Sequence, residues 1–189
     1  MIRSGNRSIG LGFARGGTAA RMLCLAAVGL FGALPALAAP TTVYLVRHAE
    51  KDAIPQHDPQ LSRKGMGRAF DLQRVLRSVT LSGVFHTEAR RTQQTVTPVA
   101  KGHDLRAELV GAPEPDKLIE KIKTEHTGKA VVVAGHSNTI PDLLKRLGVP
   151  EDQIPTIGEH EYDHMFVVTL TEDGKTYMMH MHYGEQTSQ

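Results

Sequence analysis

The chain of 189 residues carries 22 lysines and arginines against 20 acidic residues, a formal net charge of +2. Four of the basic residues and none of the acids lie in the first 38 positions, so residues 39–189 carry a formal charge of −2. This balance excludes a broad nucleic-acid-binding surface. Cys24 is the one cysteine, so residues 39–189 contain neither a disulfide nor a thiol nucleophile.

Residues 1–38 have the pattern of a secretory signal peptide. A basic segment precedes a short apolar run, which ends in Ala36-Leu37-Ala38, the small-residue pattern of a cleavage site. We expect cleavage after Ala38, export to the periplasm or the outside of the cell, and no stable membrane insertion afterwards. An uncleaved anchor is the alternative. Two glycines and a proline interrupt the run, which is short for a membrane span, and they disfavour that alternative.

From residue 39 onward, buried strands alternate with amphipathic helices, which is typical of a single α/β domain. The pattern predicts strands at 43–46, 83–87, 104–109 and 129–135, and helices at 61–79, 88–102, 114–128 and 137–148. Two further strands within 164–182 are joined by a turn at 172–175. We therefore predict a three-layer α/β sandwich with a mostly parallel central sheet, to which the last hairpin adds an antiparallel element.

Local signals predict how the helices begin and end. Ser62 is expected to cap the first helix, which carries apolar residues at roughly helical spacing: Phe70, Leu72, Val75, Leu76 and Val79. Pro98 is expected to shorten or kink the second helix. Ser137 or Asn138 is the expected cap of the fourth helix.

Basic and titratable residues follow three of the predicted strands. Arg47 and His48 stand directly after the first strand. Arg90 and Arg91 begin the helix after the second strand, and His136 follows the late strand AVVVA. Ligands of open α/β sheets bind beyond the carboxyl ends of the strands, so these side chains share one pocket if the strands are neighbours.

This set of side chains suits a phosphoryl group. Guanidinium groups bind phosphate oxygens in bidentate geometry, and a helix that begins near Ser137 adds amide donors. A neutral imidazole among such cations can attack phosphorus and become a phosphohistidine. The neighbouring cations Arg47, Arg91 and His136 would keep the ring of His48 neutral. We expect a backbone carbonyl to hold its Nδ1–H and to leave Nε2 for the attack.

Three stretches, in this order, resemble the histidine phosphatase superfamily: RHAE at 47–50, RTQQT at 91–95 and GHSNT at 135–139. The resemblance spans about residues 43–170 and points to the branch of cofactor-independent phosphatases and cofactor-dependent phosphoglycerate mutases. The order of the motifs and their places at three strand ends make it specific.

The resemblance implies a role for each residue of the site. It makes His48 the nucleophile that is transiently phosphorylated. Arg47, Arg91 and His136 would hold the phosphoryl oxygens, with neither a metal nor a cofactor. Arg91 matches the family better than Arg90, because it precedes the Thr-x-x-Thr pattern. Arg90 would then be solvated or would face the rest of the substrate.

Members of the family that cleave alkyl phosphates usually present a carboxylate that protonates the leaving oxygen. Glu108, Glu114 and Asp116 lie in the corresponding interval, and Glu50 beside the nucleophile is a fourth candidate. Some short members lack such an acid and act on substrates with better leaving groups. The sequence leaves open which of the four is the donor, or whether there is one.

We predict an exported, metal-independent phosphatase that hydrolyses a phosphomonoester or a phosphoamidate through a phosphohistidine on His48. Its partner would be a small phosphorylated substrate or a phosphoprotein, and the sequence leaves the oligomeric state open. A phosphomutase of the same family is one alternative, disfavoured because the chain lacks long insertions that could build a lid. A phosphate-binding protein without catalysis is the other, disfavoured by the intact His48 and His136.

Other polar residues have ordinary interpretations. Thr87 is either a turn hydroxyl or a phosphate contact. His180 and His182 lie two apart on a predicted strand and therefore share a face, with His160 and His164 nearby in the sequence. A metal site normally has a third protein ligand and an open position. We therefore interpret these histidines as ordinary residues of an edge strand and predict no metal site.

Overall fold

The computed structural model of the chain describes residues 39–187, which all belong to the compact unit Leu37–Gln189. The predicted signal peptide, residues 1–38, lies outside the described residues, and so does its cleavage site. Across residues 39–187, no helix is both long and apolar enough to cross a membrane.

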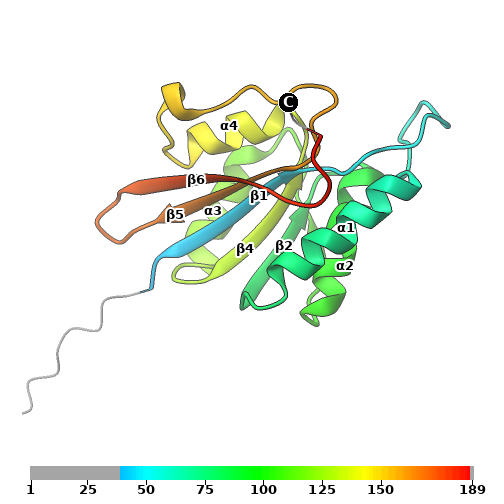
Figure 1. Cartoon of the computed structure of the whole chain (residues 1–189). Helices are drawn as coiled ribbons and strands as arrows, with labels where there is room; N and C mark the ends of the chain where they lie inside the picture. The colour runs from blue at the N-terminus through cyan, green and yellow to red at the C-terminus, as the bar shows by residue number, and fades with distance from the viewer. Residues whose placement is uncertain (1–38, 188–189) are drawn as a thin grey trace, which may run out of the picture. The chain divides into compact units, whose positions relative to one another are not determined.

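Six strands form one sheet in the order β3-β2-β4-β1-β5-β6 (Figure 1). The strands are β1 (Thr41–Arg47), β2 (Leu81–His86), β3 (Ala107–Leu109), β4 (Ala130–Gly135), β5 (His164–Leu170) and β6 (Thr176–His182). The first four strands pair in parallel, whereas β5 runs antiparallel to both β1 and β6. The predicted parallel sheet with an antiparallel hairpin is confirmed.

Helices cover both faces of this sheet (Figure 1). The helices are α1 (Arg63–Leu76), α2 (Arg90–Gly102), α3 (Pro115–Glu125) and α4 (Thr139–Arg146), followed by the short 3-10 helix η1 (Glu151–Gln153). α1 and α2 bury Leu72 and Val96 on one face, and α3 and α4 bury Ile122 and Leu144 on the other. Each face therefore has its own apolar core, and the predicted three-layer sandwich is confirmed.

The start of α1 agrees with the sequence, but its predicted apolar stripe is partly wrong. The hydroxyl of Ser62 accepts a hydrogen bond from a backbone amide of the first turn, as expected of an N-cap. Leu72 and Leu76 are buried, whereas Phe70 and Val75 are exposed. Both lie on the side of the helix that faces solvent, because the sheet and α2 cover only one stripe of it.

Pro98 does not shorten α2, which continues to Gly102. The neighbouring Val96 and Val99 are fully buried in the core that α2 shares with the sheet. This packing outweighs the one backbone hydrogen bond that a proline omits inside a helix.

The register of the parallel strands determines where their carboxyl ends lie. Arg47 is the partner of Gly135 across the β1–β4 pair, and His86 is the partner of Ala134 across the β2–β4 pair. The three strands therefore end side by side. The residues that follow them meet at one edge of the sheet.

Two glycines of α1 provide a matched test of its packing. A Cβ atom on Gly65 would overlap the backbone carbonyl of Glu50, whereas a Cβ atom on Gly67 would meet nothing within 4 Å. We expect Gly65→Ala to lower the free energy of unfolding by about 1–3 kcal/mol, the usual cost of overpacking. Gly67→Ala should raise it by roughly 0.5–1 kcal/mol. Denaturant unfolding measures both, and equal effects would contradict the close packing of α1 on Glu50.

Candidate active site

His48 lies immediately beyond β1 and is buried, with 4% of its surface exposed. Its backbone amide donates to the carbonyl of Gly135 at 2.9 Å. Its ring Nδ1 donates to the carbonyl of Ala49 at 2.8 Å, since a carbonyl oxygen can only accept. The proton of the neutral ring is therefore on Nδ1, which leaves the lone pair on Nε2, as the sequence analysis expects.

Burial keeps the ring of His48 uncharged. It is the largest of the effects that lower the pKa of His48 to about 3, and the positive charges of Arg47 and Arg91 lower it further, as does His136 when it is protonated. The hydrogen bond to Ala49 acts in the opposite direction and does not compensate. The sequence analysis attributed the neutral ring to the cations alone, so it missed the larger cause.

Arg47 is buried as deeply as His48, with 3% of its surface exposed. Its Nη1 donates to the carbonyls of Gly158 at 2.6 Å and Glu161 at 3.0 Å. The guanidinium carbon lies 4.4 Å from the centre of the Tyr162 ring, a cation–π contact. These contacts hold the cation beside the nucleophile candidate without a buried ion pair.

Arg91, in the first turn of α2, reaches the same edge of the sheet. Its Nη2 lies 3.5 Å from Nδ1 of His136, and its Nη1 lies 4.0 Å from a carboxylate oxygen of Asp58. Arg90 is exposed, and its backbone amide donates to Asp58 at 2.9 Å. Within residues 39–187, the buried Nε atoms of Arg47 and Arg91 have no hydrogen-bond partner. An anion would satisfy such donors.

His136 completes the group, with its ring centre 5.4 Å from that of His48. Its Nε2 is 2.9 Å from the hydroxyl of Thr87, which in turn is 2.9 Å from the hydroxyl of Thr92. Because Arg91 can only donate to Nδ1, we place the ring proton on Nε2, donated to Thr87. Burial, followed by the charge of Arg91, lowers the pKa of His136. Thr87 thus positions His136. The two residues are 49 apart in the sequence, so no local pattern indicates this contact.

The predicted position of the α4 N-cap is confirmed at Asn138, but the side-chain capping bond is missing. Asn138 occupies the N-cap position in a helical conformation and makes no side-chain capping bond, and α4 begins at Thr139. Instead, the hydroxyl of Thr139 accepts a hydrogen bond from the backbone amide of His136 at 2.8 Å. This bond fixes the backbone of His136 at the end of β4.

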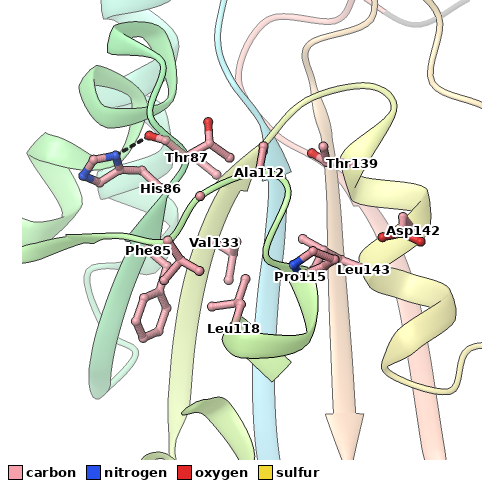
Figure 2. A pocket seen from close by; sticks show the side chains of 14 residues that line it. Phe85, His86, Thr87, Ala112, Pro115, Leu118, Val133, Thr139, Asp142 and Leu143 are labelled. Atoms are coloured by element: carbon pink, nitrogen blue, oxygen red, sulfur yellow. Dashed lines mark hydrogen bonds between the residues drawn. The ribbon is translucent and has the colours of Figure 1, made fainter. Parts of the chain in front are cut away.

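Two hollows adjoin this edge of the sheet. The open polar groove has a volume of about 550 Å³ and is lined by Arg91, His136, Glu88 and side chains from 51–59. The apolar cavity shown in Figure 2 lies behind Thr87, between the sheet, α3 and α4, and has a volume of only about 30 Å³. It has room for little more than one water molecule, so it cannot admit a phosphorylated ligand, whereas the polar groove can.

None of the four carboxylates considered as proton donors lines this groove. Each instead pairs with a cation elsewhere: Glu50 with Arg68, Glu108 with Lys121, Glu114 with Lys117 and Asp116 with Arg146. The carboxylates that do line the groove are Asp58 and Glu88. A hydrogen bond from the amide of Ala112 lowers the pKa of Glu88, so this carboxylate is ionised at neutral pH. Glu88 is not among the predicted donors, because these come from the interval after Arg91 and from Glu50 beside His48.

The edge of the sheet thus gathers two neutral imidazoles and two guanidinium groups, of which His136 and Arg91 line the polar groove. Residues 43–111 match the histidine phosphatase superfamily, branch 1. This stretch contains Arg47, His48 and Arg91, so the chain is similar to that superfamily over the part that carries three of the predicted site residues. No curated protein matches its sequence.

Solved structures of phosphatases and of a phosphoglycerate mutase have a similar fold. The protein histidine phosphatase SixA, in complex with tungstate, is 19% identical, with a TM-score of 0.62 over 75% of this chain and 96% of that chain. A mycobacterial glucosyl-3-phosphoglycerate phosphatase is 13% identical, with a TM-score of 0.61 over 74% of this chain and 97% of its own. A phosphoglycerate mutase from Bacillus anthracis is 15% identical, with a TM-score of 0.61 over 76% of this chain and 93% of its own.

The buried ring of His48 gives a prediction for pH titration. We expect it to stay neutral down to about pH 4, since its folded-state pKa is about 3. The unfolded chain takes up a proton on this residue near pH 6.5, so the site costs stability as the pH falls from about 6.5 towards 3. Histidine-ring NMR would measure the midpoint, with His48→Gln identifying the resonance. A midpoint near 6 would contradict the burial argument.

Proposed function

We propose that this chain is a phosphatase that transfers a phosphoryl group to His48 and then to water. The observation that carries the proposal is the neutral imidazole of His48, whose Nδ1 is held by the carbonyl of Ala49. Arg47, Arg91 and His136 surround it at the same edge of the sheet. A protein that only binds phosphate needs the cations. It does not need a histidine held in the tautomer that leaves Nε2 free to attack.

The proposed reaction has two steps. In the first, the Nε2 lone pair of His48 attacks phosphorus, and the bond from phosphorus to the leaving group breaks. In the second, water attacks the phosphohistidine, phosphate is released and the lone pair returns to Nε2. Arg47 and Arg91 would stabilise the equatorial oxygens in both transition states, where charge is spread over them. His136 would donate to these oxygens once its Nδ1 is protonated.

The groove favours a substrate whose leaving group departs without an acid of the protein. Glu88 is ionised at neutral pH and is therefore a poor proton donor. The four carboxylates suggested by the sequence point to other partners. We propose a phosphoamidate, such as a phosphohistidine, or an activated ester, with the proton of the leaving group supplied by solvent. The structural likeness to a protein histidine phosphatase supports this choice.

The phosphomutase remains the second candidate, because one structural neighbour is a phosphoglycerate mutase. A mutase has to retain its intermediate while this molecule reorients in the site, and an enclosed pocket favours such retention. The groove beside Arg91 and His136 is open to solvent, and this supports hydrolysis. A mutase would leave phosphate on the product instead of releasing it.

We also propose that the phosphatase acts outside the cytoplasm, after removal of residues 1–38. This proposal rests on the sequence of the leader alone. It would be tested by finding the mature N-terminus near Ala39 in the protein recovered from the periplasm or medium.

Substitution of His48 tests the proposed chemistry directly. We expect the wild-type protein to hydrolyse p-nitrophenyl phosphate with EDTA present and His48→Ala to show no turnover. Arg91→Ala should lower kcat by about 100-fold or more, as for the loss of one transition-state donor. Arg90→Ala is the matched control on the same helix and should stay near wild type, because its side chain is exposed. Equal turnover of His48→Ala and wild type would refute the role of His48.

The ionised state of Glu88 in the groove predicts how the rate depends on the leaving group. We expect kcat/KM for a phosphorylated imidazole or an aryl phosphate to exceed that for a simple alkyl phosphate by at least about 100-fold, the usual contribution of a general acid. Glu88→Gln should leave the alkyl-phosphate rate nearly unchanged. A large loss in this variant would show that Glu88 is an acid catalyst after all.

A further inference from the structure

A second group of histidines lies on the β5–β6 hairpin. His164 and His182 are direct partners across the two strands, and His180 lies two residues before His182, so all three project from one face of the ladder. Their ring centres are 4.9, 5.0 and 4.9 Å apart. One nitrogen from each ring lies within 4.8 Å of the others. The third ligand that the sequence analysis required is therefore His164, brought in from the neighbouring strand.

Carboxylates orient two of these rings. Nε2 of His164 lies 3.2 Å from a carboxylate oxygen of Glu161, and Nδ1 of His182 lies 3.2 Å from a carboxylate oxygen of Asp163. Metal-binding histidines usually donate their second N–H to a carboxylate in this way, which fixes the tautomer and the ring orientation. The pattern assigns Nδ1 of His164 and Nε2 of His182 as the coordinating atoms.

The position of His180 fits the same site. Its Nε2 lies 2.7 Å from Nδ1 of His164, as in a hydrogen bond between two imidazoles that share one proton. Two nitrogens on one tetrahedral zinc ion, each at about 2.0–2.1 Å, would lie about 3.3 Å apart. A small rotation of the exposed His180 ring provides that separation. An ion would replace the shared proton between the two rings.

The surroundings leave the cluster within reach of an ion. His164 is buried, whereas His180 and His182 are exposed at the edge of the sheet. Phe166 stacks on His180 with ring centres 4.6 Å apart and covers one side of that ring. An ion can therefore approach the three rings from the exposed side of the sheet edge.

We propose that His164, His180 and His182 form a binding site for a divalent late transition-metal ion such as Zn²⁺. Three imidazoles are the ligands that Zn²⁺ and its neighbours in the first row prefer, and they leave one coordination position open. The site is separate from the groove beside His48 and takes no part in the phosphoryl transfer proposed above.

One segment connects this metal site with the active site. The side chain of Glu161 orients His164, while its backbone carbonyl accepts the hydrogen bond from Arg47. Tyr162, the next residue, lies against the guanidinium of Arg47. An ion on the three histidines would therefore brace the segment that covers Arg47, which makes its role structural.

The test is zinc titration by calorimetry on the full chain, prepared without a histidine tag. We expect the wild type to bind one zinc ion per chain. His180→Asn and His182→Asn should each weaken zinc binding by at least about 100-fold, a larger effect than the loss of a residue that only orients a ligand. His160→Asn is the control, since His160 is exposed and outside the cluster. His164 is left unchanged because it is buried, and its substitution could disturb folding.

Two further readouts identify the site. Co²⁺ should give the intense visible absorption of tetrahedral coordination in the wild type and in His160→Asn, but not in His180→Asn. Zn²⁺ should raise the Tm of the wild type and leave that of His180→Asn unchanged. Equal zinc affinity of the wild type and the His180 and His182 variants would overturn the proposal. So would the absence of zinc binding by a wild-type protein that is folded by circular dichroism.

Discussion

The burial of Arg47 at the end of β1 is the constraint on which the rest of the site depends. A guanidinium group taken out of water has to be hydrogen-bonded or paired. Its partners are the carbonyls of Gly158 and Glu161, the carboxylate of Glu159 and the ring of Tyr162, more than 100 residues further along the chain. The segment that carries them therefore folds over the strand end. Covering the cation also removes His48 from water, and this burial keeps its imidazole neutral.

The same segment explains why two histidine groups of different character lie close together in one small domain. At the strand ends, two imidazoles stand among arginines, which suits an anion. On the hairpin side, three imidazoles stand beside Glu161 and Asp163, which suits a cation. The charge of the neighbouring residues thus distinguishes the two histidine groups: arginines favour a phosphoryl group at one, and carboxylates favour a metal ion at the other. Glu161 belongs to both, through its backbone on one side and its carboxylate on the other.

The sequence determined those features that depend on neighbouring residues. Alternating buried strands and amphipathic helices indicate the layered α/β fold, and Ser62 marks the start of α1. The parallel arrangement then brings the strand ends together, so the positions of Arg47, His48 and His136 along the chain were enough to group them. Local signals failed where packing outweighs them, as at Pro98, because one missing hydrogen bond costs less than the buried apolar contacts contribute.

Only the tertiary structure decided which residues far apart in the sequence share a site. It paired Thr87 with His136 and placed Glu88 in the groove. It also joined His164 to His180 and His182, because the strand register sets one histidine opposite another. A sequence pattern reports periodicity along one element, whereas these contacts depend on register between strands and on loop paths across the sheet. The sequence by itself therefore determined which reactive side chains stand at the strand ends. The tertiary structure decided which distant residues contact those side chains.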